Sequence, residues 1–180
     1  MSTTEQSTIT TEIPTGTWNL DPVHSSVGFA VKHSGVMTFR GDFPEFDAKL
    51  DDGRLEGTAE VASVRVDEPN LTGHLQTPDF FDAEQFPELR FVSNTIERDG
   101  DKVSIAGDLT LRGVTHPVEL SGAISGPITD GYGTQRLGLD LETTINRQDY
   151  KISWNQPLPS GDPALADDVV ITANVALVQA

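Results

Sequence analysis

The stretch Leu137-Gly-Leu-Asp-Leu-Glu142 decides the fold class, because its leucines alternate with small or acidic residues. The same period of two runs through Val27, Phe29 and Val31. Alternation of this kind is typical of β-strands that have one buried face and one solvated face. Asp-Gly pairs, which suit tight hairpin turns, separate several of the alternating runs. The sequence therefore predicts antiparallel strands joined by hairpins.

Alternation and turn signals together mark eight or nine antiparallel strands. The predicted strands span 17–21, 24–34, 36–50, 55–67, 89–98, 102–112, 116–128, 134–147 and 168–179. Several exceed the usual length of about five or six residues, which favours a coiled sheet or a barrel over a flat sandwich. Segment 70–88 lacks alternation, so we expect an all-β barrel with a short helical crossover over one end.

The chain of 180 residues is expected to form one domain. Residues 1–16 are polar and have neither a basic start nor an apolar run, so they predict a disordered tail and no signal peptide. Residues 17–180 are predicted to form the barrel domain. No stretch approaches the roughly 20 apolar residues of a membrane span, and the expected location is cytoplasmic.

The composition excludes several classes of function. Asp and Glu outnumber Lys and Arg by 28 to 12, and the net charge of −16 would repel nucleic acid and an anionic membrane surface. Cysteine is absent, which rules out disulfides and thiolate chemistry. The four histidines lack the spacing of a metal site, and nucleotide-binding and serine-hydrolase motifs are missing. We therefore expect no metal, no cofactor, no nucleic-acid partner and no direct membrane insertion.

The inward strand faces bear on whether the barrel is filled or hollow. A barrel of about eight strands can hold packed side chains or one small ligand. Gly107, Gly122 and Gly126 fall on predicted inward faces, where they would leave volume for a ligand. The alternative is that these glycines mark bulges or corners at which a barrel strand bends.

Three polar residues are candidates for the mouth of the barrel. His33 and Arg147 continue the inward faces of two strands, and Arg40 is the third candidate. A buried arginine needs a partner, so Arg147 is expected at the mouth or in an ion pair with Asp149 or Asp21. His33 beside a carboxylate would also serve as the general base of an enzyme, which is an alternative function.

Three segments together resemble a known family. They are Trp18-Asn-Leu-Asp-Pro-Val-His-Ser-Ser-Val-Gly-Phe-Ala-Val-Lys-His33-Ser-Gly, Thr77-Pro-Asp-Phe-Phe-Asp-Ala-Glu-Gln-Phe-Pro-Glu-Leu-Arg-Phe91 and Gly107-Asp-Leu-Thr-Leu-Arg-Gly-Val-Thr-His-Pro-Val118. In this order and spacing they resemble the YceI-like family of lipocalin-like bacterial proteins, over about residues 17 to 179. The resemblance implies an eight-stranded antiparallel lipocalin-like barrel whose apolar tunnel holds an isoprenoid or related amphiphilic lipid. It also implies a binding protein without catalytic residues, and possible homodimers.

The inward faces, together with the resemblance, give a candidate tunnel lining. It comprises Val27, Phe29, Val31, Phe80, Phe81, Phe91, Leu109, Leu111, Leu120, Ile124, Leu137, Leu139, Leu141 and Ile145. The phenylalanines near the crossover either line the tunnel or anchor the crossover to the barrel. His33, Arg40 and Arg147 are the expected polar contacts at the mouth.

The expected function is lipid binding for transport, storage or sequestration. Cations are spread thinly along the chain, so a neutral head group such as a quinone is favoured over a prenyl diphosphate. Two alternatives stay open. One is an enzyme that acts on a lipid-like substrate with His33 as general base, and the other is a filled barrel that serves as an interaction or stress-response module.

Overall fold

A computed structural model describes residues 12–180 of the chain. In this part of the chain, ten strands form one antiparallel sheet, accompanied by one α-helix and three short 3-10 helices. The strands are β1 (Thr17–Leu20), β2 (Ser26–His33), β3 (Met37–Asp42), β4 (Phe46–Asp51), β5 (Arg54–Glu60), β6 (Glu88–Asp99), β7 (Lys102–Leu111), β8 (Val114–Thr129), β9 (Gln135–Asn146) and β10 (Leu165–Gln179). The helices are α1 (Pro69–Leu75) and the 3-10 turns Pro22–His24, Val61–Ser63 and Arg147–Tyr150.

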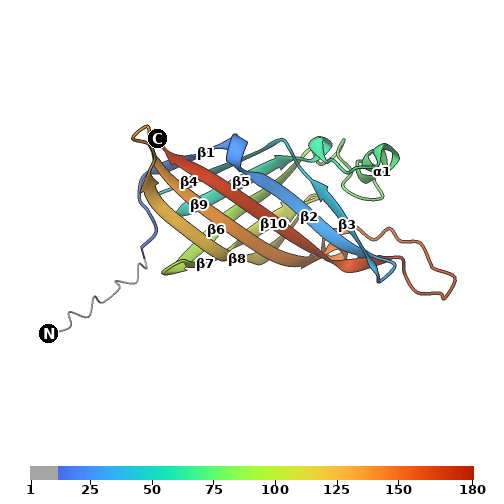
Figure 1. Cartoon of the computed structure of the whole chain (residues 1–180). Helices are drawn as coiled ribbons and strands as arrows, with labels where there is room; N and C mark the ends of the chain where they lie inside the picture. Colours follow the sequence, from blue (N-terminus) through green and yellow to red (C-terminus); the bar gives the residue numbers. More distant parts are fainter. Residues whose placement is uncertain (1–11) are drawn as a thin grey trace.

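The sheet closes into an eight-stranded barrel. β1 pairs with β4 on one edge and with β10 on the other, which closes the order β1-β4-β5-β6-β7-β8-β9-β10 into a ring. β2 also pairs with β10, beyond the end of β1, and β3 pairs with β2 (Figure 1). The prediction of an all-β, eight-stranded antiparallel barrel with a short helical crossover is confirmed.

Two predicted strands differ from the observed ones. The strand predicted at 36–50 is two strands, β3 and β4, separated at 43–45, where Pro44 has no amide hydrogen for the ladder. The strand predicted at 55–67 ends at Glu60, because the 3-10 turn Val61–Ser63 follows directly. The first break lies where the chain passes from β3, which pairs with β2 alone, into the ring strand β4. The second lies where the chain leaves β5 for the crossover that carries α1.

Residues 12–16 lie against the barrel, although the sequence predicted a disordered tail as far as residue 16. Ile13 packs on the core, and the amide of Gly16 donates to Asp52 Oδ1 at 2.8 Å. Trp18 Nε1 donates to the carbonyl oxygen of Thr15 at 3.0 Å. The rest of the predicted tail, residues 1–11, lies outside the described residues.

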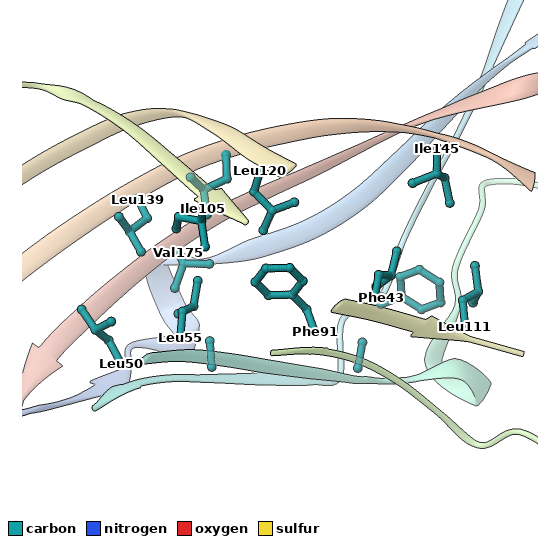
Figure 2. Packing of buried hydrophobic residues seen from close by; sticks show 14 of the residues in the cluster. Phe43, Leu50, Leu55, Phe91, Ile105, Leu111, Leu120, Leu139, Ile145 and Val175 are labelled. Carbon is teal, nitrogen blue, oxygen red and sulfur yellow. The ribbon is translucent and has the colours of Figure 1, made fainter. Parts of the chain in front are cut away.

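Side chains fill one half of the barrel, around β1. Its large, fully buried side chains include Trp18, Leu50, Ile105, Ile124 and Leu177. Figure 2 shows Leu50, Leu55, Ile105, Leu139 and Val175 on one side of the Phe91 ring and Phe43, Leu111 and Ile145 on the other. We refer to the half around β1 as the packed half.

The inward glycines accommodate neighbouring groups and do not create a hollow. At Gly107 a Cβ atom would lie 2.6 Å from the Phe91 ring, and at Gly122 it would lie 1.8 Å from the carbonyl oxygen of Asp140. Gly126 has a φ of 96° and lies where the register between β8 and β9 shifts. Gly107 and Gly122 therefore serve close packing, and Gly126 lies at a bulge, which is the role that the sequence offered as the alternative for these glycines.

Arg136 joins two acids at the packed end of the barrel. Its Nη1 lies 2.8 Å from Asp21 Oδ2 and its Nε lies 2.6 Å from Asp130 Oδ2. A hydrogen bond with His24, assisted by Arg136, holds the pKa of Asp21 below its usual value. Arg136 and two backbone amides likewise hold the pKa of Asp130 below its usual value.

We expect this cluster to make stability fall in acid. A carboxyl group whose pKa is lowered by folding stabilises the native state above its unfolded pKa of about 3.9, and this contribution is lost as the pH falls through the lower folded value. Asp130→Asn keeps an acceptor for the backbone amides but removes the charge. It should lower the melting temperature at neutral pH, and its difference from the wild type should shrink below about pH 4. Circular dichroism melts across this range, with exposed Glu142→Gln as the control, provide the measurement. A difference that stays constant with pH would contradict the prediction.

Candidate functional site

The half of the barrel opposite β1 contains a cavity of about 450 Å³, which we call the main cavity. This volume lies in the range of small-molecule sites, about 300–1,000 Å³. Its lining residues with apolar side chains or none are Val27, Gly28, Phe29, Val31, Met37, Phe39, Phe43, Leu71, Leu75, Phe80, Phe81, Leu89, Leu109, Leu111, Ile145, Ile152, Trp154, Ala164, Leu165, Val169 and Ile171. Its polar lining residues are His33, Thr38, Arg147 and Gln156. The lining is therefore apolar almost throughout.

A smaller cavity of about 90 Å³, the inner cavity, lies deeper in the barrel. Val27, Leu89, Leu109 and Ile171 line both cavities, so the two are neighbours along the barrel. Phe91, whose ring covers Gly107, also lines the inner cavity. A chain-like ligand that fills the main cavity would thus point its far end toward the inner cavity.

The main cavity meets the surface between the β2–β3 turn and the segment that follows Trp154. His33, Met37 and Gln156 line the cavity and are themselves exposed, with Met37 51% exposed. Figure 1 places this β2–β3 turn at the end of the barrel away from the C-terminus. These exposed lining residues mark the mouth.

Aromatic side chains hold the crossover over the main cavity. Phe81 packs against Phe29 and Phe43, with ring centroids 5.9 and 5.6 Å apart. Phe80 packs against Trp154, with centroids 5.3 Å apart. Both crossover phenylalanines also line the cavity, so lining and anchoring are combined in the same side chains.

Arg147 lies in the wall of the main cavity and is 3% exposed. Its Nε donates to the carbonyl oxygen of Ala166 at 2.9 Å, and its Nη1 donates to those of Ile152 and Trp154, each at 2.8 Å. Its Nη2 lies 3.4 Å from the carbonyl oxygen of Leu165 and 3.6 Å from Asp167. Burial lowers the pKa of the guanidinium below its usual value, and Asp167 acts in the opposite direction.

The observed partners of Arg147 correct the expectation of Asp149 or Asp21. Asp21 is held at the opposite end of the barrel by Arg136. Asp149 lies in the same 3-10 turn as Arg147, and the arginine instead meets Asp167 and backbone carbonyls. Arg147 therefore ties together the chain segments beside the mouth.

The structure brings eleven of the fourteen predicted lining residues to the two cavities. Val27, Phe29, Val31, Phe80, Phe81, Leu109, Leu111 and Ile145 line the main cavity, and Phe91, Leu120 and Leu141 line the inner cavity. The other three, Ile124, Leu137 and Leu139, are buried in the packed half.

Of the predicted mouth residues, His33 and Arg147 line the main cavity. Arg40 lies elsewhere: it is exposed, it pairs in register with Ala30, and it borders neither cavity. In the β2–β3 ladder Arg40 occupies the position next to Phe39, and neighbouring strand positions face opposite sides. Since Phe39 lines the cavity, Arg40 faces outward.

Sequence reasoning missed several lining residues after β9 and at the start of β10. Ile152 and Trp154 line the main cavity, although their segment was not assigned to any strand or site. Their alternation with Lys151 and Ser153 was a usable signal. Val169 and Ile171 belong to the predicted closing strand, whose inward face was not assigned.

The histidines that pair with carboxylates lie away from the two cavities. Among residues 12–180, the histidines that contact a carboxylate are His24 and His74, which contact Asp21 and Asp79. Neither histidine lines a cavity. The same part of the chain contains no group of three or more side chains placed to hold a metal ion. It also contains no helix with the length and apolar character of a membrane span.

Sequence comparisons identify relatives over nearly the whole chain. A profile of the YceI-like domain matches residues 18–177. A UPF0312 protein of Staphylococcus epidermidis is 33% identical over 168 residues, which cover 87% of this chain and 94% of the relative. A UPF0312 protein of Photorhabdus laumondii is 31% identical over 134 residues, which cover 71% of this chain and 70% of the relative.

Solved structures share the barrel. The Campylobacter jejuni YceI protein is 26% identical, with a TM-score of 0.72 over 83% of this chain and 90% of that one. A polyisoprenoid binding domain from Saccharophagus degradans is 12% identical, with a TM-score of 0.73 over 91% of this chain and 98% of that one, which is a likeness of fold alone. With its barrel, its apolar cavity and a YceI-like profile that spans residues 18–177, this chain belongs to the YceI-like family.

Proposed function

We propose that this protein binds one long-chain isoprenoid or related amphiphilic lipid in the main cavity. The observation that carries the proposal is the apolar main cavity with the inner cavity behind it. Each methylene group removed from water contributes about 0.8 kcal/mol, so affinity for an apolar chain grows with the length buried. A structural relative from Saccharophagus degradans is described as a polyisoprenoid binding domain, which supports the same class of ligand.

In the proposed complex the apolar tail runs from the mouth toward the packed half. The proposed tail contacts are Val27, Phe29, Val31, Phe80, Phe81, Leu109, Leu111 and Ile145 in the main cavity and Phe91, Leu120 and Leu141 deeper in. His33 and Gln156, at the mouth, offer hydrogen-bond donors to a carbonyl oxygen of the head group.

A neutral head group such as a quinone fits this cavity better than a prenyl diphosphate. A diphosphate needs cationic donors to offset its desolvation. Arg147 is the arginine in the cavity wall, and backbone carbonyls and Asp167 already occupy its donors. Lys32 lies on the outer face beside the mouth and does not line the cavity, and its Nζ donates to Thr38 Oγ1 at 3.0 Å.

Lipid binding without turnover is the role that we favour, as carrier, store or sequestering protein. The enzyme alternative needs a carboxylate beside His33, and the carboxylate-bound histidines of the described chain are His24 and His74. Cytoplasmic location, dimerisation and a role in the stress response stay predictions from the sequence and the family resemblance.

Native mass spectrometry tests the proposal. The protein is purified from its own host and then offered a prenyl quinone and a prenyl diphosphate with the same number of isoprene units. We expect one neutral long-chain lipid per chain and preferential loading of the quinone. Loading of the diphosphate alone would refute the head-group assignment. No co-purifying lipid and no uptake of either probe would refute lipid binding itself.

A further inference from the structure

The β2–β3 turn exposes apolar side chains beside the mouth of the main cavity. Val36, at the tip of the turn, is 82% exposed, and Met37 next to it is 51% exposed. Met37 also lines the cavity, so the exposed apolar surface is continuous with the cavity wall. An exposed pair of this kind, continuous with an apolar cavity, is typical of a surface that contacts another apolar phase.

The same hairpin is cationic, although the chain as a whole is strongly acidic. Residues 22–41 contain Lys32 and Arg40 and no Asp or Glu, whereas the net charge of the chain is −16. Both side chains are exposed, and each lies a few residues behind the apolar tip. An apolar tip followed by cations matches the order of layers at a membrane surface, where acyl chains lie beneath anionic phosphates.

The acids of the packed end lie too far away to cancel this local charge. β2 has eight residues, which corresponds to about 26 Å between its two ends. The Debye length is about 8 Å at physiological ionic strength, so charges at the far end of β2 are largely screened. Closer acids lie outside the hairpin: Asp167 and Asp168 lie on β10 beside Lys32, where the β2–β10 register shifts, and Asp162 lies in the connecting loop. Arg147 lies 3.6 Å from Asp167, so the cationic surface is that of the hairpin itself, and the hairpin is the part of the mouth suited to face anionic lipid.

We infer that the tip of the β2–β3 hairpin docks on membranes that contain anionic phospholipid, with Val36 and Met37 in the interface and Lys32 and Arg40 near the phosphates. This inference rests on the proposed function, because docking would place the mouth against the phase in which isoprenoids dissolve. The sequence argument against membrane contact used the charge of the whole chain. The local charge of the hairpin has the opposite sign.

Vesicle flotation tests the inference with the full chain. The probes are phosphatidylcholine vesicles with and without phosphatidylglycerol, at low and at high salt. We expect the wild type to float with the anionic vesicles at low salt and to bind less at high salt. Val36→Glu should reduce the partition coefficient about tenfold, and Lys32→Glu should reduce it at least about fivefold.

Two matched variants control for the substitutions. Val23→Glu changes a valine that is 83% exposed at the other end of β2, and Lys49→Glu changes an exposed lysine on β4. Both should bind vesicles as the wild type does, and the melting temperature of each variant verifies its folding. No binding by the wild type, or equal losses in Val23→Glu and Val36→Glu, would overturn the inference. If the wild type does not bind vesicles, the expected contact of the exposed apolar tip is a protein partner.

A second measurement separates failure of docking from failure of lipid binding. Val36 and Lys32 border neither cavity, so their variants should load a prenyl quinone from detergent as the wild type does. Transfer of the quinone from anionic vesicles should slow about tenfold in Val36→Glu. Vesicle binding without quinone loading would refute the proposed function and retain docking. Quinone loading without vesicle binding would refute docking alone.

Discussion

Arg147→Ala should lower the free energy of unfolding by about 3 kcal/mol or more. The guanidinium is 3% exposed and donates to carbonyl oxygens of Ala166, Ile152 and Trp154. A buried polar group that loses its hydrogen-bond partner costs about 1–3 kcal/mol, and this substitution removes the donor from several at once. Urea unfolding followed by tryptophan fluorescence measures the effect.

Two further variants separate charge from geometry. Arg147→Lys keeps the charge but places its donors on one nitrogen, which cannot reproduce the planar fork of a guanidinium, so an intermediate loss is expected. Arg90→Ala removes an arginine whose side chain is 48% exposed and pairs with Glu56, and it should cost at most about 1 kcal/mol. If Arg147→Ala costs no more than Arg90→Ala, Arg147 does not hold the mouth segments together.

Arg147 shows what the sequence could and could not predict. Its inward position follows from alternation along the strand before it, and burial then requires partners. The partners themselves are carbonyl oxygens of residues 152, 154, 165 and 166, which every sequence offers at every position. Only the path of the chain after the 3-10 turn Arg147–Tyr150 brings them together, and no local pattern encodes that path.

The barrel was predictable because its strands are long and one-sided. The leucines at every second position of β9 indicate a strand with one buried face. Short hairpin turns then allow few registers in which such strands can pair. The break between β3 and β4 was harder to predict, because apolar residues continue through it. Phe43 in the break is buried and lines the main cavity, so its hydrophobicity reflects the cavity wall and not strand pairing.

The position of the cavity within the barrel was harder to predict from the sequence than the barrel fold itself. Leu137, Leu139 and Ile145 share one face of β9, yet the two leucines lie in the packed half and Ile145 lines the main cavity. Alternation shows on which face of the sheet a side chain lies, but not how far along the barrel axis it lies. Depth depends on strand tilt and on where aromatic residues such as Trp154 cover the end, and both are properties of the assembled fold.

Val27→Trp should shorten the isoprenoid chain that the barrel accepts. Val27 lines both the main and the inner cavity, so a larger side chain there obstructs the passage between them. Each methylene group kept out of the inner cavity forfeits about 0.8 kcal/mol, and two of them correspond to a loss of affinity of about tenfold. Chains short enough to end in the main cavity should lose much less. Competition binding with prenyl quinones of increasing length measures this dependence.

Val170→Trp is the matched control for the length dependence. Val170 pairs with Ala30 on β2 and Thr144 on β9, next to Ile171 but on the opposite face of β10, and it borders neither cavity. The same indole placed there adds bulk to the barrel wall from outside and should leave binding unchanged at every chain length. An equal loss for long and short chains in Val27→Trp would indicate a general disturbance of the site and contradict the arrangement of the tail. A loss confined to long chains, absent in Val170→Trp, requires a ligand tail that reaches past Val27, because only such a tail meets the new side chain.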